Sequence, residues 1–347
     1  MESPMSDLPD TMPALILRDG GFDPTQQGPH IDRLSDWVTL AEVPVPSPGP
    51  GQVLIRVHLA PVNPSDLHFI KGAYGQPRVA GAPAGFEGMG TVAAAGPGAE
   101  ELLGRRVAFV ATGTGSWAGF ALTQAAVCIP LRDDVSDTDG AALIVNPLTA
   151  RAMLGLVPEG GAVVLTAAGS ELGRLMCALG RDMGLKVIAV IRSAGAAGEL
   201  RDAGAAEVLV SGEAGFATAR DAAIKAHKPR ILLDAVGDQV AADLFAAMPG
   251  GASWVVYGKL STEAPQLSQM GQFIFMGKRI EGFWLTQWLG AAGAEGRAAA
   301  VAEVQERFAK GLWHTREGAR LGLGAAIEGL VPALARGTGK VFLDPGA

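Results

Sequence analysis

A short run of small residues is the clearest chemical feature of this sequence. It reads Ala167-Ala168-Gly169-Ser170-Glu171-Leu172-Gly173 and lies between an apolar segment and a predicted helix. Small residues let the backbone approach a phosphate, and the first turn of a helix offers unpaired N–H groups and a positive dipole end. The run departs from G-x-G-x-x-G, and an ordinary strand–turn–helix connection is the alternative. We interpret it as a pyrophosphate-binding turn.

The end of the next apolar segment indicates which dinucleotide the turn would hold. Ile191-Arg192-Ser193 follows the glycine turn by about 20 residues, where an acidic residue usually holds the ribose hydroxyls of NAD. A guanidinium group suits a 2′-phosphate, which a carboxylate would repel. We therefore predict NADPH as the cofactor, with a solvated arginine at a strand end as the alternative.

Aromatic side chains gather in the segment Lys278–Leu289, although aromatic residues make up only 6% of the chain. Phe283, Trp284 and Trp288 lie close together there. We expect a buried strand that runs into a helix. At the carboxyl edge of a parallel sheet, such a cluster could enclose a nicotinamide ring and a substrate acyl group, with plain core packing as the alternative.

Composition excludes several classes of function. The net charge is −7 and there is no long basic run, which argues against nucleic-acid binding. No window of about 18 residues stays apolar without a proline or a charge, so we expect no membrane span. The polar, acidic N-terminus does not resemble a signal peptide. Cys128 and Cys177, the only cysteines, have apolar neighbours. They predict buried thiols in a reducing cytoplasm and exclude a disulfide framework.

Two kinds of pattern divide the chain. Closely spaced short strands, Gly and Pro fill the first 140 or so residues and resemble a partly open antiparallel barrel. Apolar strands then alternate with helices, which predicts a parallel sheet with helices on both faces. The predicted strands are Gln52–Leu59, Gly90–Ala94, Arg106–Val110, Ala162–Thr166, Lys186–Ile191, Glu207–Val210, Arg230–Asp234 and Ser253–Tyr257; the predicted helices are Ser170–Met183 and one that buries Val301, Val304 and Phe308. The segment Gly20–Asp36 is predicted as the most exposed loop, without a role.

This layout resembles the medium-chain dehydrogenase/reductase superfamily over nearly the whole chain. The zinc alcohol dehydrogenases of that superfamily carry a cysteine ligand and a Gly-His-Glu segment. Asn63, in Val62–Asp66, and Phe86, in Gly85–Gly88, stand at the positions of the cysteine and the histidine. The five histidines show no ligand spacing. The resemblance therefore implies a zinc-free enzyme without a metal site.

Within the zinc-free branch, three segments are similar to 2-enoyl thioester reductases. They are Asn63-Pro64-Ser65-Asp66 with Lys71–Gly75, Val145–Ala150, and Gly282–Trp288. Quinone oxidoreductases share the first. The resemblance implies an α/β fold: a Rossmann doubly wound parallel sheet, residues 140–274, inserted in a GroES-like, partly open β-barrel catalytic domain, residues 1–139 plus 275–347. It also implies a homodimer formed through edge strands of the cofactor domain.

The resemblance assigns roles by position. Tyr74 takes the place of the catalytic tyrosine, with a loop residue packed on the barrel as the alternative. Asn63, Trp284 and Trp288 would line the substrate pocket. The cofactor-contacting positions are Asn146, Gly169, Ser170, Glu171, Leu172, Arg192, Ser193, Tyr257, Gly258, Lys259, Leu260, Phe283, Trp284, Leu285 and Lys340. Glu171 departs from the small residue that the family usually has in the phosphate turn.

The implied activity is NADPH-dependent reduction of an activated C=C bond, with a trans-2-enoyl thioester of CoA or carrier protein as substrate. Hydride addition at the β-carbon places charge on the carbonyl oxygen, which a hydroxyl donor can stabilise. A phenol stays protonated at pH 7, and Tyr74 and Tyr257 are the only tyrosines. A quinone or enone oxidoreductase is the first alternative. A non-catalytic NADPH-binding interaction protein is an alternative of another class.

Overall fold

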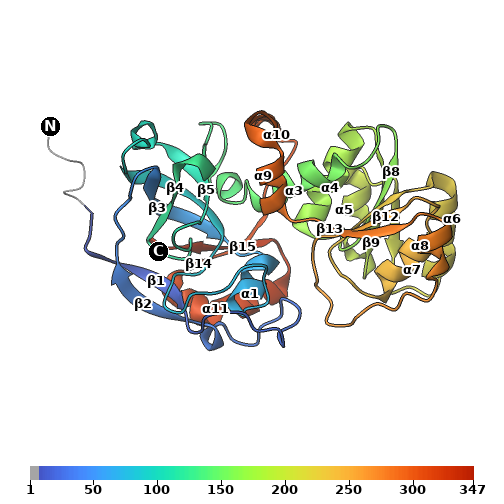
Figure 1. Cartoon of the computed structure of the whole chain (residues 1–347), viewed down its shortest axis with the longest axis horizontal. Helices are drawn as coiled ribbons and strands as arrows, with labels where there is room; N and C mark the ends of the chain where they lie inside the picture. The colour runs from blue at the N-terminus through green and yellow to red at the C-terminus, as the bar shows by residue number, and fades with distance from the viewer. Residues whose placement is uncertain (1–7) are drawn as a thin grey trace. The chain divides into compact units, whose positions relative to one another are not determined.

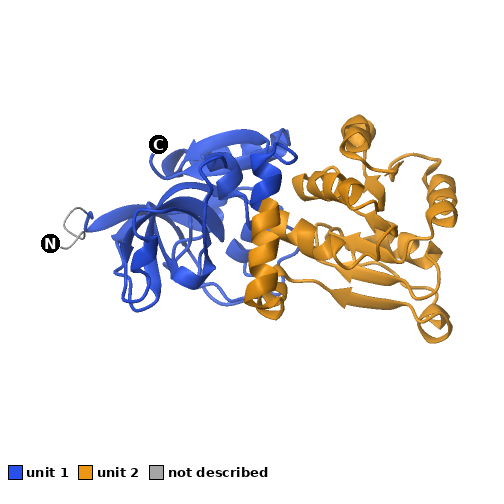
Figure 2. Ribbon diagram, turned by 90° about the horizontal axis from the view of Figure 1, so that it is seen from above, with its two compact units in different colours: residues 1–145, 305–347 blue, residues 146–304 orange. Residues whose placement is uncertain are grey.

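The computed structural model describes residues 8–347 and divides into two compact units. Unit 1 comprises Met1–Val145 and Gln305–Ala347, and unit 2 comprises Asn146–Val304 (Figure 2). Both junctions differ from the domain limits expected at residues 139/140 and 274/275. Beyond the expected limit at residue 274, Arg279–Gly282 adds a strand to the parallel sheet of unit 2. Among the described residues, no helix combines the length and apolar composition needed to cross a bilayer.

Unit 1 is built on strands that pair antiparallel, except that β14 and β15 pair parallel. Its main sheet has the order β14-β15-β3-β4-β5-β7, and β6 pairs with β3 off this path. β1 and β2 form a separate pair. Within the described residues the ends of the main sheet, β14 and β7, do not pair, so the partly open barrel is confirmed. The strands are β1 (Thr11–Leu17), β2 (Val38–Pro44), β3 (Gln52–Pro61), β4 (Glu87–Ala95), β5 (Arg106–Val110), β6 (Phe120–Gln124), β7 (Cys128–Pro130), β14 (Glu317–Gly322) and β15 (Lys340–Asp344).

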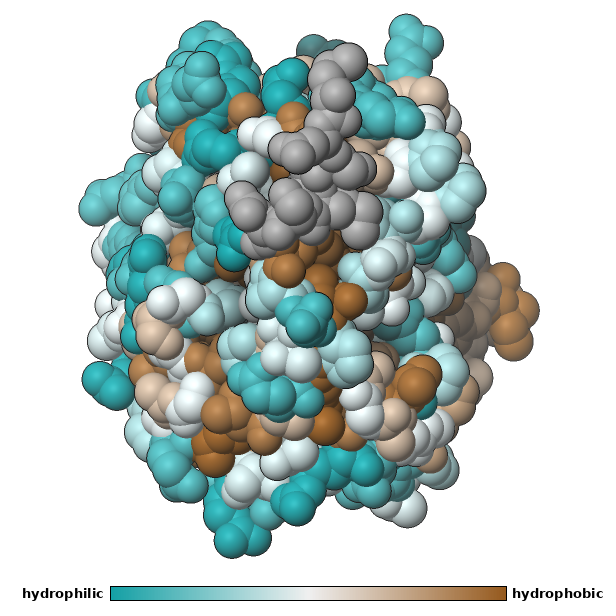
Figure 3. Space-filling model, turned by 90° about the vertical axis from the view of Figure 1, so that its left-hand side faces the viewer, coloured by the Kyte–Doolittle hydropathy of each residue, from teal (hydrophilic) through white to brown (hydrophobic). Residues whose placement is uncertain are grey.

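Helices and a large core complete unit 1. The helices are α1 (Pro64–Ile70), α2 (Asp137–Ala141) and α11 (Leu323–Arg336), with short 3-10 turns at Leu34–Asp36, Glu100–Leu102 and Ala125–Val127. Trp117, Phe109 and Ile55 are among the fully buried residues of the core that α11 helps to close. The side of the molecule seen in Figure 3 carries β1 and β2 and shows apolar residues in separate patches among hydrophilic ones.

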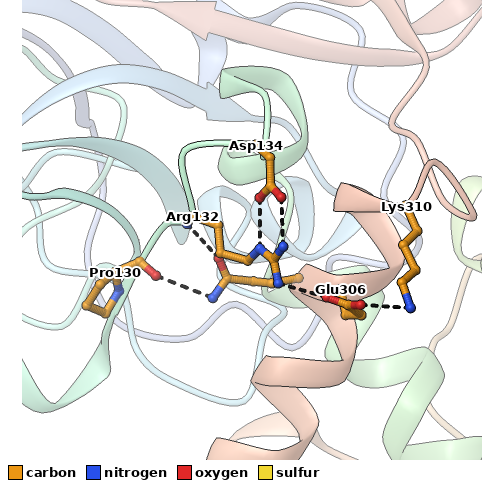
Figure 4. Close-up of polar contacts among 6 residues, drawn as sticks. Pro130, Arg132, Asp134, Glu306 and Lys310 are labelled. Atoms are coloured by element: carbon orange, nitrogen blue, oxygen red, sulfur yellow. Dashed lines mark hydrogen bonds and ion pairs between the residues drawn. The ribbon is translucent and has the colours of Figure 1, made fainter.

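The C-terminal end of helix α10 (Gly293–Ala309) is held by a cluster of polar contacts (Figure 4). Arg132, just after β7, donates from Nε and Nη2 to Asp134 at 2.8 and 2.7 Å and from Nη1 to Glu306 at 2.7 Å. Glu306 also pairs with Lys310 at 2.8 Å. Gln305 accepts from the backbone N–H of Arg132 at 3.0 Å. These contacts explain why the chain returns to unit 1 at residue 305.

Unit 2 is a six-stranded, all-parallel sheet with the order β10-β9-β8-β11-β12-β13. Chain order therefore reverses between β8 and β11, as in the doubly wound dinucleotide-binding fold. Helices cover both faces (Figure 1): α4 (Glu171–Asp182) packs on β9 beside α5 (Ala197–Ala203), and α6 (Phe216–His227) packs beside α7 (Gln239–Ala247). The strands are β8 (Ala162–Leu165), β9 (Lys186–Ile191), β10 (Glu207–Val210), β11 (Ile231–Asp234), β12 (Ser253–Val256) and β13 (Arg279–Gly282).

The helices of unit 2 follow the predicted alternation. They are α3 (Val145–Leu154), α4 (Glu171–Asp182), α5 (Ala197–Ala203), α6 (Phe216–His227), α7 (Gln239–Ala247), α8 (Gly271–Phe275), α9 (Leu285–Ala291) and α10 (Gly293–Ala309), with a 3-10 turn at Ala194–Ala196. Ser170 is the N-cap of α4, one residue before the helix begins, and its Oγ accepts the N–H of Gly173 at 3.1 Å. The expectation of a buried strand before α9 is wrong: β13 is the edge of the sheet, and all four of its residues are exposed.

Candidate functional site

The glycine turn of unit 2 is tightly built. Gly173 lies so close to the preceding strand end that a Cβ there would meet the carbonyl oxygen of Ala168 at 2.3 Å. Ala167 has φ +48°, an uncommon conformation for a residue with a Cβ. Arg174, which sequence reasoning missed, reaches back from α4 to the carbonyl oxygen of Gly169 at 2.8 Å and pairs with Glu199 at 3.3 Å. The turn is therefore fixed at the N-terminus of a helix, where an anion is favoured.

The predicted phosphate residues lie next to that turn. The N–H of Ala168 donates to the carbonyl oxygen of Val190 at 3.1 Å, which places the turn beside the carboxyl end of β9. Arg192 and Ser193 follow β9 and are exposed. Among residues 8–347, Arg192 makes no ion pair, so its guanidinium group is available to an anion in solution. The unusual Glu171 has one carboxylate oxygen buried and is engaged in a contact within the protein.

A buried carboxylate organises the next strand ends. Asp234, at the end of β11, accepts from Thr166 Oγ1 at 2.5 Å, from Trp254 Nε1 at 2.9 Å, and from the N–H groups of Val236 and Gly237 at 3.0 Å. Sequence reasoning gave Asp234 no role, because its partners are backbone groups and residues of the neighbouring strands. The loop that follows β11 is therefore held rigidly at the carboxyl edge of the sheet.

The candidate segment Tyr257–Leu260 is attached to that loop. The N–H of Tyr257 donates to the Asp234 carbonyl oxygen at 2.9 Å, and the N–H of Leu260 donates to Ala235 at 3.0 Å. Burial, and to a lesser degree Asp234, raises the pKa of Tyr257 above its usual value, so its hydroxyl is protonated at neutral pH. Gly258 packs closely, since a Cβ there would meet the Ala235 carbonyl oxygen at 2.7 Å. Lys259 is exposed beside it.

The aromatic segment begins at the carboxyl end of β13. The N–H of Phe283 donates to the carbonyl oxygen of Val256 at 2.9 Å, which brings it next to the Tyr257 strand end. Trp284 caps α9, and Leu285 begins that helix. Trp284 and Trp288 are half-buried. The carboxyl edge of this sheet thus gathers the turn, Arg192, and the segments at Tyr257 and Phe283, as predicted for a dinucleotide-binding unit.

Unit 1 holds the remaining candidates in a buried polar network. Asn63 and Asp66 form a capping box at the start of α1, with Pro64 at the first helical position. The Asn63 side chain donates to Glu87 at 2.8 Å and accepts from Lys340 Nζ at 2.5 Å. Glu87 in turn accepts the N–H of Val145 at 2.8 Å. The structure therefore joins Asn63 and Lys340, which lie 277 positions apart in sequence.

Burial sets the electrostatics of this network. It raises the pKa of Asp66 to about 7, and the nearby Glu87 carboxylate adds to that shift. Burial also raises the pKa of Glu87, although the Lys340 ammonium group partly opposes the effect. Sequence reasoning missed Asp66 and Glu87 as members of a network. Asp66 and Glu87 both lie in the segments that were compared with zinc enzymes, and this shared placement was the sequence signal for a common network.

Tyr74 lies on the loop that follows α1. Its ring packs on Phe86 with centroids 4.8 Å apart, and Phe86 packs on Phe69 at 4.9 Å. Phe86, the residue at the histidine position of zinc enzymes, thus supports the tyrosine ring. Tyr74 is half-buried. A phenol can donate a hydrogen bond at neutral pH. Residues 8–347 contain no cluster of three His, Cys, Asp or Glu side chains that could hold a metal ion.

Comparisons with known proteins agree with this architecture. Residues 49–133 match the family model described as the alcohol dehydrogenase GroES-like domain. A solved structure from Mesorhizobium loti, provisionally named an NADPH:quinone reductase, is 44% identical and covers 97% of this chain and 99% of its own, with a TM-score of 0.93. The chain belongs to the medium-chain dehydrogenase/reductase superfamily. The resemblance noted from Asn63, Tyr74 and the aromatic segment is thereby confirmed at the level of the superfamily.

Two curated members of the superfamily bear the name mitochondrial enoyl-[acyl-carrier-protein] reductase. The Caenorhabditis elegans protein is 30% identical over 72% of both chains. The Rattus norvegicus protein is 31% identical over 68% of this chain and 65% of its own length. The chain thus spans slightly less than two thirds of the rat relative.

The candidate site residues of this chain are distributed over both units. Tyr74, Asn63 and Lys340 belong to unit 1. Asn146, on α3, opens unit 2, which carries all the other candidates. Cys177 is buried as expected, whereas Cys128 is only half-buried; burial raises the pKa of both thiols to about 12. Neither thiol is a reactive nucleophile at neutral pH.

Proposed function

We propose that this protein is an NADPH-dependent, zinc-free reductase of activated C=C bonds, with trans-2-enoyl thioesters as substrates. The observation that carries the proposal is Tyr74, a phenol supported by the Phe86 ring at the position where zinc enzymes place a ligand. The names of the curated relatives favour the thioester. CoA and carrier-protein thioesters share the reacting group.

In the proposed reaction, NADPH supplies a hydride to the β-carbon of the enoyl group. The electron pair of the C=C bond moves toward the thioester carbonyl, and negative charge develops on its oxygen. Tyr74 donates its hydroxyl hydrogen bond to that oxygen and stabilises the enolate. The α-carbon then takes a proton from water, which completes a saturated thioester. One hydride and one proton are thus added across the C=C bond, and no metal ion is needed to balance the reaction.

The residues of unit 2 fit the proposed cofactor. The pyrophosphate would lie against the N–H groups at Gly169–Leu172, and the 2′-phosphate against Arg192 and Ser193. Tyr257–Leu260 and Phe283–Leu285 would bound the nicotinamide end, with Asn146 and Lys340 as further contacts. In unit 1, the Asn63 amide oxygen accepts from the Lys340 ammonium group at 2.5 Å, and a cationic group beside that oxygen disfavours a metal ion there. Asn63, Trp284 and Trp288 are proposed to line the substrate pocket.

One assay distinguishes the candidate functions. The purified protein is mixed with NADPH and crotonyl-CoA, and absorbance of the reduced nicotinamide is followed. Turnover supports the thioester reductase. Turnover only with quinones or enones supports the alternative suggested by the Mesorhizobium loti relative. Binding of NADPH without turnover of any acceptor supports a non-catalytic protein.

The Tyr74→Phe variant tests the assigned donor. It keeps the ring on Phe86 and removes only the hydroxyl group. We expect kcat for crotonyl-CoA to fall about 10²–10³-fold, with little change in the KM for NADPH. Tyr257→Phe is the matched control, since its segment is assigned to the cofactor. Near-normal turnover by Tyr74→Phe on every enoyl thioester would exclude the assignment.

We further propose that the protein acts as a homodimer and resides in the cytoplasm. The edge strand β13 exposes backbone groups that a second copy could pair. Apolar side chains of the preceding helix are exposed beside it, with Ile274 74% and Phe275 85% accessible. Such side chains are costly to leave in water and typical of an interface. The cytoplasmic location rests on the free thiols Cys128 and Cys177.

A further inference from the structure

The segment Gly20–Asp36, which the sequence left without a role, is tied to the loop that carries Tyr74. Three of its carbonyl oxygens accept from one buried ammonium group: Lys71 Nζ lies 2.9 Å from Gln27 O and 3.0 Å from both Gly28 O and His30 O. Lys71 is only 5% exposed. An ammonium group taken out of water requires such acceptors, so the contact is specific rather than incidental.

A second attachment lies at the far end of the Tyr74 loop. Arg78 donates from Nη1 to the carbonyl oxygen of Ile70 at 2.9 Å, and its backbone pairs in both directions with Gly21 at 2.9 and 3.2 Å. The N–H of Asp23 donates to the Gly72 carbonyl oxygen at 2.9 Å. The segment Gly20–Asp36 and the Tyr74 loop pack closely against each other, because a Cβ on Gly72 would meet Asp23 N and Arg78 Nη2 at 2.8 Å.

The segment is itself anchored in the core of unit 1. Ile31 and Leu34 are buried in the cluster that also contains Phe69 and Ile70 of α1. The Tyr74 loop therefore begins at Lys71, ends at Arg78, and is fixed to the same rigid segment at both points. Only Gly72 and Ala73 separate Lys71 from Tyr74, so a shift of the Lys71 end of the loop moves the phenol directly.

We propose that Gly20–Asp36 is a brace for the catalytic loop and that Lys71 is the positioning residue through which it sets the place of the Tyr74 hydroxyl group. This inference rests on the proposed function. A donor must lie within a fraction of an ångström of its working position, and a misplacement of about 1 Å can cost about 10²-fold in rate. Lys71 acts on the rate only through Tyr74.

A double-mutant cycle tests the proposal. Wild type, Lys71→Met, Tyr74→Phe and the double variant are compared for kcat with NADPH and crotonyl-CoA. Methionine keeps the length and apolar stem of lysine and removes the ammonium group. We expect kcat to fall at least about tenfold for Lys71→Met in the presence of Tyr74 and to change less than about twofold in the Tyr74→Phe background. The KM for NADPH should stay unchanged, and Lys71→Arg should restore part of kcat.

Lys278→Met is the matched control. Lys278 is also a buried lysine whose ammonium group binds backbone carbonyl oxygens, here of Phe245 at 2.7 Å and Ala246 at 3.0 Å in unit 2. Its loss removes the same kind of group without touching the Tyr74 loop. We expect Lys278→Met to lower the Tm while kcat stays near the wild-type value. A general loss of stability is thereby separated from a loss of position.

The outcomes distinguish the proposed catalytic role of Tyr74 from the proposed positioning role of Lys71. A normal kcat for Tyr74→Phe overturns the proposed catalytic role and the brace with it. A low kcat for Tyr74→Phe together with an equal, additive effect of Lys71→Met in both backgrounds overturns the brace alone. If Lys71→Met does not fold, Asp23→Ala takes its place in the cycle, because it removes the side-chain contacts with Thr25 and Gln26 that shape the segment and keeps the backbone bond from Asp23 to Gly72. A smaller kcat loss that disappears in the Tyr74→Phe background is then expected.

Discussion

Replacement of Arg192 by alanine should weaken the preference of this protein for NADPH over NADH. The guanidinium group stands at the carboxyl end of β9, beside the turn that the Ala168–Val190 hydrogen bond holds in place. It is exposed and makes no ion pair within residues 8–347, so its removal breaks no internal contact. Any effect of Arg192→Ala therefore reports on a ligand rather than on the fold.

The magnitude follows from the kind of contact that is lost. Hydrogen bonds to charged groups contribute about 1.5–3 kcal/mol, and solvent exposure places Arg192 at the lower end of that range. About 1.5 kcal/mol corresponds to roughly a tenfold change in an equilibrium constant. We expect the KM for NADPH to rise about tenfold, whereas the KM for NADH, which lacks the 2′-phosphate, should change little. kcat with saturating NADPH should be retained.

Steady-state kinetics with each cofactor at saturating crotonyl-CoA gives both constants. Arg201→Ala is the matched control, since it removes an exposed arginine from α5 in the same unit. It should leave the KM for both cofactors unchanged. Equal increases for NADPH and NADH in Arg192→Ala, or an equal effect of the control, would refute the role assigned to Arg192.

Three further outcomes are expected. Because burial raises the pKa of Asp66 to about 7, the folded protein binds more protons than the unfolded chain between about pH 4 and pH 7. The free energy of unfolding should therefore fall as the pH rises through that window, by at most about 4 kcal/mol. Urea unfolding at pH 5 and pH 7.5 should show a smaller difference in this free energy for Asp66→Asn than for the wild type. Exhaustive chelation should leave turnover unchanged; activity lost and then restored by zinc would contradict the zinc-free site. Phe275→Glu should shift the protein from dimer to monomer in sedimentation experiments, and a wild-type monomer would exclude the proposed interface.

Local patterns predicted several elements of both units well. β9, β10 and β5 have the predicted limits, and α4 begins at the residue after Ser170. Strands buried on both faces give continuous apolar runs, and a serine followed by a small-residue turn marks a helix start, so the signal lies within a few residues. The position of Arg192 beside the turn followed from the same alternation of strand and helix.

The exposed edge position of β13 and the limits of the two units could not be predicted from local patterns. An isolated strand pattern does not say whether the strand lies at the centre or the edge of a sheet, because that depends on which strands follow in space. The return to unit 1 at residue 305 depends on contacts of Arg132 with Gln305 and Glu306, more than 170 positions away. No local periodicity records such a pairing.

Local sequence patterns also did not predict the buried polar network of Asn63, Glu87 and Lys340, and this network affects how Lys340 can be tested. Lys340 was assigned to the cofactor by position, yet its ammonium group binds Asn63 and partly opposes the raised pKa of Glu87. Removal of one partner from a buried charged network typically costs about 3–5 kcal/mol, since the other charge stays behind without compensation. Weaker NADPH binding by Lys340→Met would therefore combine the effect of lost stability with the effect of a lost ligand contact. Arg192, exposed and without an internal ion pair in the described chain, avoids that ambiguity, which is why cofactor selectivity is best tested there.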